Sequence, residues 1–312
     1  MKLIAIFCCL PILLFAQKQN TASPGCTPEY FRYVVETLAH DSMKGRLPGT
    51  PEEKKSAEFI AAEFRKTGCK PLRKKQYCFP FDYTNPDSVI THSTGNVIAK
   101  VDTKSDYCIV ITAHYDHIGA GKHHSNDPFS HAIHNGADDN ASGVAMLLGL
   151  AAWCNEHKKD LQYDIVFAAL SAEEDGLFGA KKFLSSDLID TSKIICNLNF
   201  DMLGSLDRAR PMLVADGALE NSAWDSLLPR DTTASFFVQR SVNVVKGGAD
   251  HCVFLDANIP SILFSTGLTG FYHRPTDDPS TINYEGMINI STYLQELLMK
   301  LNRKKNLQII LR

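Results

Sequence analysis

The sequence lacks a strong excess of either charge, because 32 Lys and Arg residues stand against 35 Asp and Glu residues and the net charge is −3. It also lacks a clustered basic stripe, so a nucleic-acid-binding surface is not expected. There is no CxxC pair, no zinc-finger spacing of Cys and His, no internal repeat and no low-complexity tract. Hydrophobic residues make up 44% of the 312 residues. That share allows a sizeable core and argues against disorder.

A long hydrophobic run is missing too, except at the N-terminus. Lys2 precedes the apolar stretch at 3–15, which has the length of the central part of a signal peptide and is too short to span a bilayer. We therefore expect residues 1–16 to be a signal peptide for export to the periplasm or the medium, cleaved after Ala16. An uncleaved anchor is the alternative. The polar residues 17–26 are expected to form a linker.

Cysteine is available for disulfides in an exported chain, but the number left after position 16 is odd, so at least one thiol stays free or pairs elsewhere. Cys69 and Cys78 are close enough in sequence to bridge, and their spacing alone leaves this open. Three others lie in apolar runs and are expected to fill the core: Cys108, Cys154 and Cys196.

Helix and strand patterns alternate along most of the chain. Thr27 before Pro28, and Thr50 with Glu53, are typical of helix starts. The expected helices are 28–39, 51–67, 141–156, 177–185 and 284–301. The expected strands are 96–101, 108–113, 164–170, 194–200, 211–215, 236–240 and 260–265. Near-continuous apolar strands separated by helices predict an α/β fold with a mixed, mostly parallel central sheet and helices on both faces.

Side chains that can bind cations follow three of these strands. His114 comes after the strand at 108–113, the pair Glu173 and Glu174 after the strand at 164–170, and Asp201 after the strand at 194–200. In an open α/β sheet, ligands bind beyond the carboxyl ends of the strands, so we expect these residues to converge. Each feature alone has an ordinary explanation, such as a surface pair, an acidic first turn of a helix or a turn carboxylate. Their recurrence at the same kind of position favours a site.

Two further segments complete the pattern. HNGADDN at 134–140 brings Asp138 and Asp139 to the start of a helix, and His273 lies in FYHRPTDD after the last strand. Imidazole and carboxylate ligands suit zinc, and two cations would neutralise so many acids. One glutamate of the pair can then bind metal while its neighbour acts as a base. The sequence thus predicts a hydrolytic metal site.

Other histidines carry a weaker signal. The five expected to face solvent in the polar loop 117–138 are His117, His123, His124, His131 and His134. The loops 117–138 and 203–245 are expected to rim the site. Asp250 and His251 could support it from behind the metal ligands, or play no part.

The motifs TAHYDHIG, GADDNASG and SAEEDGLFG occur in this order, together with GNVIAKV, NFDMLG, GGADHCVF and FYHRPTDD. With them the chain, from Gly45 to Met287, resembles the zinc-dependent exopeptidases related to bacterial leucyl aminopeptidases, glutamate carboxypeptidase II and glutaminyl cyclases. The resemblance implies the fold of these enzymes. Because only a few dozen residues separate the helix at 51–67 from TAHYDHIG, we expect 27–312 to be one catalytic domain without a protease-associated insert.

Carried over position by position, the resemblance implies two zinc ions, with cobalt or manganese as alternatives. His114, Asp139 and Asp201 would bind one ion, Glu174 and His273 the other, and Asp139 would bridge the two. Asp139 is preferred to Asp138 because the bridging residue of the family directly precedes the Asn of DNASG.

The resemblance also assigns three roles around the ions. Glu173 would be the general base, and Tyr272 would stabilise the oxyanion. Asp116 would hold the His114 imidazole by a hydrogen bond from the second shell.

The implied activity is that of a dinuclear-zinc aminopeptidase, which hydrolyses the N-terminal peptide bond of peptides. We expect a monomer, without nucleic-acid partners and without a membrane in its mature form. One alternative is a glutaminyl cyclase-like enzyme with one zinc ion. Another is a carboxypeptidase or dipeptidase for acidic substrates, which would need a basic pocket residue from among Arg208, Arg210, Arg240, Lys246 and Arg274. A non-catalytic binding protein is a third.

Overall fold

The computed structural model describes residues 22–85, 89–121, 124–218, 222–230, 235–241 and 248–307. The expected signal peptide at 1–16 lies outside these ranges, as do the first part of the 17–26 linker, His123 and Lys246. Within the described ranges, no helix combines the length and the apolar character needed to cross a membrane.

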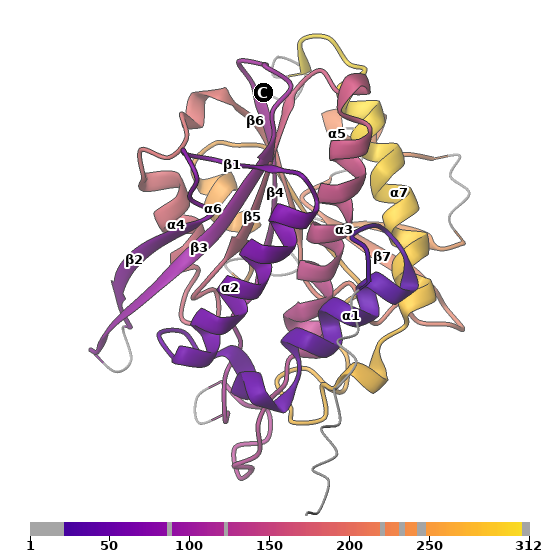
Figure 1. Ribbon diagram of the computed structural model, residues 1–312. Coiled ribbons are helices and arrows are strands. Elements are labelled where there is room, and N and C mark those ends of the chain that lie inside the picture. Colours follow the sequence, from indigo (N-terminus) through magenta and orange to yellow (C-terminus); the bar gives the residue numbers. More distant parts are fainter. Residues whose placement is uncertain are drawn as a thin grey trace, which may run out of the picture.

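One mixed sheet of nine strands runs through the described part of the chain (Figure 1). The strands are β1 (Lys70–Pro71), β2 (Cys78–Thr84), β3 (Thr91–Val101), β4 (Cys108–His114), β5 (Asp164–Leu170), β6 (Ile194–Phe200), β7 (Met212–Asp216), β8 (Phe237–Ser241) and β9 (Ser261–Ser265). Their order is β1-β3-β5-β4-β6-β9-β7-β8, with β2 paired to β3. The central strands β5, β4, β6 and β9 run parallel, whereas β3 and β7 join them antiparallel.

Helices cover both faces of this sheet. They are α1 (Pro28–Leu38), α2 (Pro51–Lys66), α3 (Gly143–Glu156), α4 (Phe178–Ser185), α5 (Ala223–Leu227), α6 (His251–Asp256) and α7 (Tyr284–Asn302). Shorter helical turns are η1 (Asp41–Arg46), η2 (Ala137–Ser142), η3 (Lys158–Asp160), η4 (Thr191–Lys193) and η5 (Pro279–Thr281). The larger apolar core lies under α1, α2, α3 and α7, and a smaller one lies under α4 and α6 on the opposite face (Figure 1). The predicted fold class is confirmed.

The central strands show why their sequences are continuously apolar. Every residue of β4, β5 and β6 is buried, because helices cover the sheet on both sides. The predicted helix starts are also present, since the side chains of Thr27 and Thr50 accept hydrogen bonds from backbone N–H groups in the first turns of α1 and α2. The side chain of Asn283 caps α7 in the same way.

The sequence analysis missed β1, β2, α5 and α6, and placed the start of β3 five residues late. Strand β2 pairs with β3 along its whole length but lies at the edge of the sheet, where its residues alternate in burial and Pro80 is tolerated. The possible bridge between Cys69 and Cys78 is not formed, and no cysteine in the described ranges takes part in a disulfide bond.

Candidate metal centre

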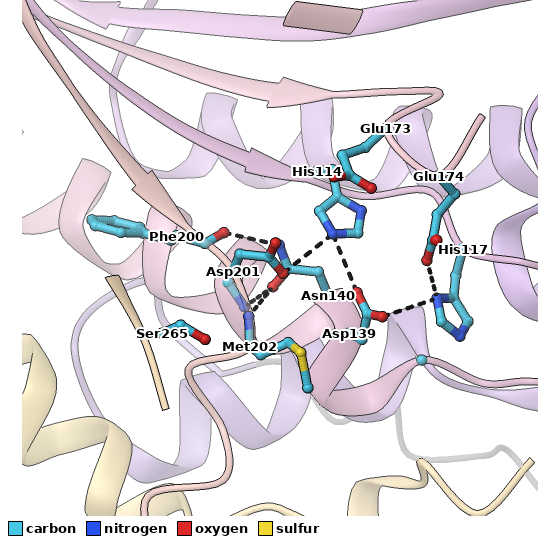
Figure 2. Close-up of polar contacts among 12 residues, drawn as sticks. His114, His117, Asp139, Asn140, Glu173, Glu174, Phe200, Asp201, Met202 and Ser265 are labelled. Atoms are coloured by element: carbon cyan, nitrogen blue, oxygen red, sulfur yellow. Dashed lines mark hydrogen bonds and ion pairs between the residues drawn. The ribbon is translucent and has the colours of Figure 1, made fainter. Parts of the chain in front are cut away.

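Three neighbouring strands deliver polar residues to one edge of the sheet. His114 is the last residue of β4, while Glu173 and Glu174 follow β5 and Asp201 follows β6. Because β4 pairs in parallel with both β5 and β6, the carboxyl ends of the three strands lie side by side. The predicted convergence is confirmed, and Figure 2 shows these side chains pointing toward one another.

The first group of possible ligands contains His114, Asp139 and Asp201. The Nε2 atom of His114 lies 3.2 Å from Asp139 Oδ1 and 3.4 Å from Asp201 Oδ1. All three side chains are largely buried, the most accessible being Asp201 at 16%. A buried imidazole nitrogen thus faces two carboxylate oxygens, which is a donor set that zinc accepts.

The second group contains Asp139 again, with Glu174 and His273. The Nε2 atom of His273 lies 3.2 Å from Asp139 Oδ2 and 3.1 Å from Glu174 Oε2. The other ring nitrogen, Nδ1, lies 2.7 Å from the carbonyl oxygen of His124. A carbonyl only accepts, so Nδ1 carries a proton, and Nε2 is the ring nitrogen that faces the carboxylates and can bind a cation.

Asp139 stands between the two groups, with Oδ1 turned to the first and Oδ2 to the second. Its neighbour Asp138 faces elsewhere, because Asp138 Oδ1 accepts hydrogen bonds from Gly204 N at 2.7 Å and from Ser142 Oγ at 3.2 Å. The geometry therefore favours Asp139 over Asp138 as the shared residue. The assignment of metal ions to the five side chains stays a prediction.

Local backbone contacts hold Asp139 in place. Asp277, in the same segment as His273, accepts hydrogen bonds from the N–H groups of Asp138 and Asp139. On the other side, Asn140 donates to the carbonyl oxygen of Phe200 at 2.9 Å (Figure 2). The loop before α3 is thereby fixed to two other parts of the site.

Two loop histidines expected to face solvent are buried. His117 is fully buried, with Nδ1 2.8 Å from Glu174 Oε1 and 3.8 Å from Asp139 Oδ2. His134 is also fully buried, with Nε2 2.8 Å from Ser125 Oγ. That expectation is wrong for these two because their loop folds back over the strand ends instead of extending into water. For His124 and His131, which are exposed, it is confirmed.

Asp116 lies beside His114, but its carboxylate is farther from the imidazole than the predicted hydrogen bond requires. Its Oδ1 atom is 3.7 Å from His114 Nδ1, beyond hydrogen-bonding distance, whereas the backbone oxygen of Asp116 is 3.3 Å from the same nitrogen. The carboxylate instead accepts hydrogen bonds from the N–H groups of Glu173 and Glu174, both at 3.2 Å. Asp116 therefore fixes the turn that presents the two glutamates.

A buried cation lies behind the site, which the sequence analysis did not identify. Arg46 is fully buried and donates hydrogen bonds to the carbonyl oxygens of Leu38, Tyr115, Asn135 and Gly136. Burial lowers its pKa to about 10, against the effect of nearby carboxylates that include Asp116 and Asp139, so it remains charged at neutral pH. Arg46 thus joins α1, the end of β4 and the loop before Asp139.

The paired glutamates differ in electrostatics. Burial raises the pKa of Glu173 well above its usual range, and the charge of Glu174 adds to the effect. For Glu174, burial and Asp139 act in the same direction, but hydrogen bonds from His117 and His273 outweigh them and lower its pKa to about 2. One carboxylate is therefore suited to binding a cation and the other to carrying a proton.

The histidines compensate part of this negative charge. Burial alone would lower the pKa of His114, but Glu173 and Asp201 more than offset it and the pKa lies well above the usual value. For His273, contacts to Asp139 and Glu174 likewise outweigh burial and raise the pKa to about 11. Without a cation, the site thus holds protons that neutralise its acids.

Asp250 lies behind these residues and is buried, with neither carboxylate oxygen hydrogen-bonded within the described ranges. Burial, opposed by His114 and supported by the negative charges of Asp116 and Asp201, raises its pKa to about 7. His251 turns the other way, with Nε2 3.7 Å from Asp216 Oδ2. Of the two residues considered as support, only Asp250 has a pKa that is shifted by His114, Asp116 and Asp201.

A cavity of about 300 Å³ opens from the ligand groups. Its walls include the apolar side chains of Met202, Val214, Leu263 and Leu268, and the ring of Tyr272 also borders it. That ring stacks on His273 with the centroids 3.9 Å apart. No Arg or Lys side chain lines the cavity in the part of the chain that the structure describes.

The spacing of the ligand atoms fits a metal ion. Four donors around zinc at roughly 2.0–2.1 Å lie about 3.3 Å apart when the geometry is tetrahedral. The nitrogen–oxygen distances in the two groups are 3.1 to 3.4 Å. Buried carboxylates this close to one another need a compensating charge, which divalent cations would supply.

Comparison with known proteins agrees with the geometry. A family model described as Peptidase family M28 matches residues 96–298. Aminopeptidase YwaD of Bacillus subtilis is 32% identical over 190 residues, which is 57% of this chain and 37% of that protein. The match therefore spans well under half the length of this relative.

Solved structures share the fold at lower identity. A leucine aminopeptidase precursor from Bacteroides thetaiotaomicron superposes with a TM-score of 0.71 at 18% identity, covering 91% of this chain and 99% of that one. A glutaminyl cyclase from the same organism, bound to N-acetylhistamine, also superposes with a TM-score of 0.71 at 18% identity, covering 91% of this chain and 100% of that one. The fold therefore does not distinguish an aminopeptidase from a glutaminyl cyclase, and this distinction has to come from the residues of the site.

Proposed function

Because the chain belongs to peptidase family M28, we propose that it is a two-zinc aminopeptidase that hydrolyses the N-terminal peptide bond of peptides. The observation that carries this proposal is the position of Asp139, whose two oxygens face a histidine of each ligand group, both at 3.2 Å. A carboxylate placed in this way suits two neighbouring cations, one held also by His114 and Asp201, the other by Glu174 and His273.

The residues around the ions would carry the rest of the chemistry. When bound, the ions lower the pKa of a water molecule and polarise the scissile carbonyl. Glu173, with its raised pKa, would take the proton from the attacking water and pass it to the leaving amine. Burial raises the pKa of Tyr272, so its hydroxyl stays protonated and can donate a hydrogen bond to the developing oxyanion.

The cavity supports binding of the substrate through its N-terminal residue. An apolar side chain would pack against Met202, Val214 and Leu263. Among the described residues that line the cavity there is no Arg or Lys to pair with the C-terminal carboxylate of a carboxypeptidase substrate, which supports hydrolysis at the N-terminus over the carboxypeptidase alternative.

The decisive experiment is an assay of purified protein with measured zinc content. We expect two zinc ions per chain and hydrolysis of Leu-anilide that stops with a chelator and returns with zinc. A glutaminyl cyclase would instead bind one zinc ion and convert a Gln-peptide to pyroglutamate. Absence of hydrolysis across a panel of aminoacyl-anilides, at full zinc content, would refute the proposal.

Two further parts of the proposal rest on sequence alone. We propose that residues 1–16 direct export and are removed, which N-terminal sequencing of the exported protein would test. We also propose a monomer acting on peptides, which light scattering of the purified protein would test.

A further inference from the structure

The second ligand group has a neighbour that the family resemblance does not include. His117 lies three residues after His114, and its ring faces the same two carboxylates as His273. We propose that His117 Nδ1 is a fourth protein ligand of the cation held by Asp139, Glu174 and His273. This inference rests on the proposed two-cation centre.

Distances place His117 within reach of that cation. Its Nδ1 lies 2.8 Å from Glu174 Oε1 and 3.8 Å from Asp139 Oδ2 (Figure 2). His273 Nε2 approaches the other oxygen of Glu174 and the same oxygen of Asp139. The two imidazoles thus approach the carboxylates from different sides, with their ring planes at 77° and centroids 5.6 Å apart. The ligand atoms of His117, Asp139 and Glu174 lie within 4.8 Å of one another, so one cation can contact all three side chains.

The His117 ring is confined to this position. It is fully buried, and a Cβ atom added to Gly136 would lie 2.7 Å from two atoms of the ring. Its Nε2 atom has no hydrogen-bond partner within the described ranges, whereas Nδ1 contacts Glu174 and Asp139. Burying a ring nitrogen without a hydrogen-bond partner costs free energy. Such a cost is expected where the imidazole has another role, such as binding a cation through Nδ1.

A second role is compatible with the 2.8 Å distance. Nδ1 could carry a proton and donate a hydrogen bond to Glu174, which would orient the carboxylate without contact to the ion. The two roles differ in what a substitute must supply. A ligand needs a lone pair on nitrogen, whereas an orienting residue needs only an N–H group at the same place.

The proposed ligand makes the two cation positions unequal. The second would have four protein ligands and be closed, whereas the first would have three, His114, Asp139 and Asp201, and an open coordination position. Closed sites are typical of tightly held zinc, and sites with an open position are typical of zinc that binds water. We therefore expect one zinc ion to resist chelators much longer than the other.

Asparagine at position 117 separates the two roles, because its side-chain amide places an N–H group near the position of Nδ1 but is a poor zinc ligand. We would compare His117→Asn and His117→Ala with wild type, using the exposed His131→Asn as control. The measurements are zinc affinity by competition with a chromophoric chelator, and the visible bands of the Co²⁺-loaded protein.

We expect both substitutions to weaken the tighter site by more than about 100-fold, beyond the roughly 10–100-fold typical of losing an orienting partner. The Co²⁺ bands should change in both, and His131→Asn should match wild type. If His117→Asn keeps wild-type affinity and bands, or if His117→Ala loses less than tenfold, His117 is not a ligand. Circular dichroism confirms folding, and a variant that unfolds only without metal still reports the loss of affinity.

The proposed function can fail separately. A wild-type protein that binds two zinc ions but hydrolyses no peptide would refute the aminopeptidase and leave the role of His117 standing. An active enzyme in which His117→Asn retains both ions would refute only the role of His117.

Discussion

Asp277 accepts a hydrogen bond through Oδ2 from the backbone N–H of Asp139, at 3.0 Å. Its Oδ1 atom accepts another from Asp138 N at 2.9 Å. His273, four residues earlier, contacts the side chain of Asp139. One short segment therefore holds both the backbone and the carboxylate of the residue shared by the two ligand groups.

Replacing Asp277 with Asn should disturb the site without touching a proposed ligand. An amide has one oxygen, so its NH₂ group would face one of the two N–H donors. We expect a loss of roughly 1–3 kcal/mol in the free energy of unfolding, from the donor left unpaired, and zinc binding weakened about 10–100-fold. Urea unfolding and chelator competition measure these. The exposed Asp106→Asn serves as control, and equal zinc affinity in both variants would contradict the positioning role.

Glu173 is predicted to act on protons and not to bind metal. The substitution Glu173→Gln keeps the shape of the side chain but removes its ability to accept a proton. We expect kcat to fall about 10²–10⁴-fold, with zinc content unchanged. The matching change Glu174→Gln should instead lose zinc. Full turnover in a zinc-replete Glu173→Gln enzyme would exclude the base.

Sequence reasoning located the side chains of the two ligand groups because each follows a strand or opens a helix. Strand ends at one edge of a parallel sheet converge whatever the details of the loops. The same reasoning could not place His117, because the path of its loop depends on tertiary contacts. The signal was present, since HYDH puts two histidines beside the first strand end, but a polar loop is usually solvated.

Arg46 was missed for a different reason. Arginine is usually exposed, and the sequence GRLPG at 45–49 does not indicate that the side chain of Arg46 donates to four carbonyl oxygens. Asp277 was equally hidden, because its role depends on backbone N–H groups that any residue carries. Strand β2 escaped because an edge strand with Pro80 has only a weak pattern. The sequence thus predicts side chains that do chemistry better than those that hold other segments in place.

The buried Arg46 is expected to be important for stability. Arg46→Met leaves four carbonyl oxygens without their donor and removes a buried positive charge that several acids of the site sense electrostatically. We expect a loss of roughly 3–5 kcal/mol in the free energy of unfolding, and an intermediate loss for Arg46→Lys, which keeps the charge but offers fewer donors. Lys44→Met removes only an exposed pair with Glu52 and is the control. Denaturant unfolding within about 1 kcal/mol of wild type for Arg46→Met would contradict the assigned role.

The metal-free protein should lose stability as the pH rises. Burial raises the pKa of Asp250 to about 7, so this group keeps in the folded state a proton that the unfolded chain releases near the usual value of 3.8. His273, with its pKa raised from 6.5 to about 11, adds stability below pH 6.5 that fades above it. Both groups make folding less favourable as the pH increases from 5 to 8. Glu174, whose pKa is lowered from 4.5 to about 2, contributes stability that is fully present above pH 4.5 and is lost only as the pH falls towards 2.

Zinc should reverse this trend, because the ions replace the protons that the acids and imidazoles hold, and ligand deprotonation strengthens binding as the pH rises. Since any ligand that binds only the folded state stabilises it, the increase in Tm caused by zinc should grow between pH 5 and 8. Thermal unfolding of chelator-treated and zinc-loaded protein across that range measures both effects. A metal-free Tm that is flat or rises over the same interval would show that Asp250 and His273 do not hold their protons, and the electrostatic argument for cations at this site would fail with it.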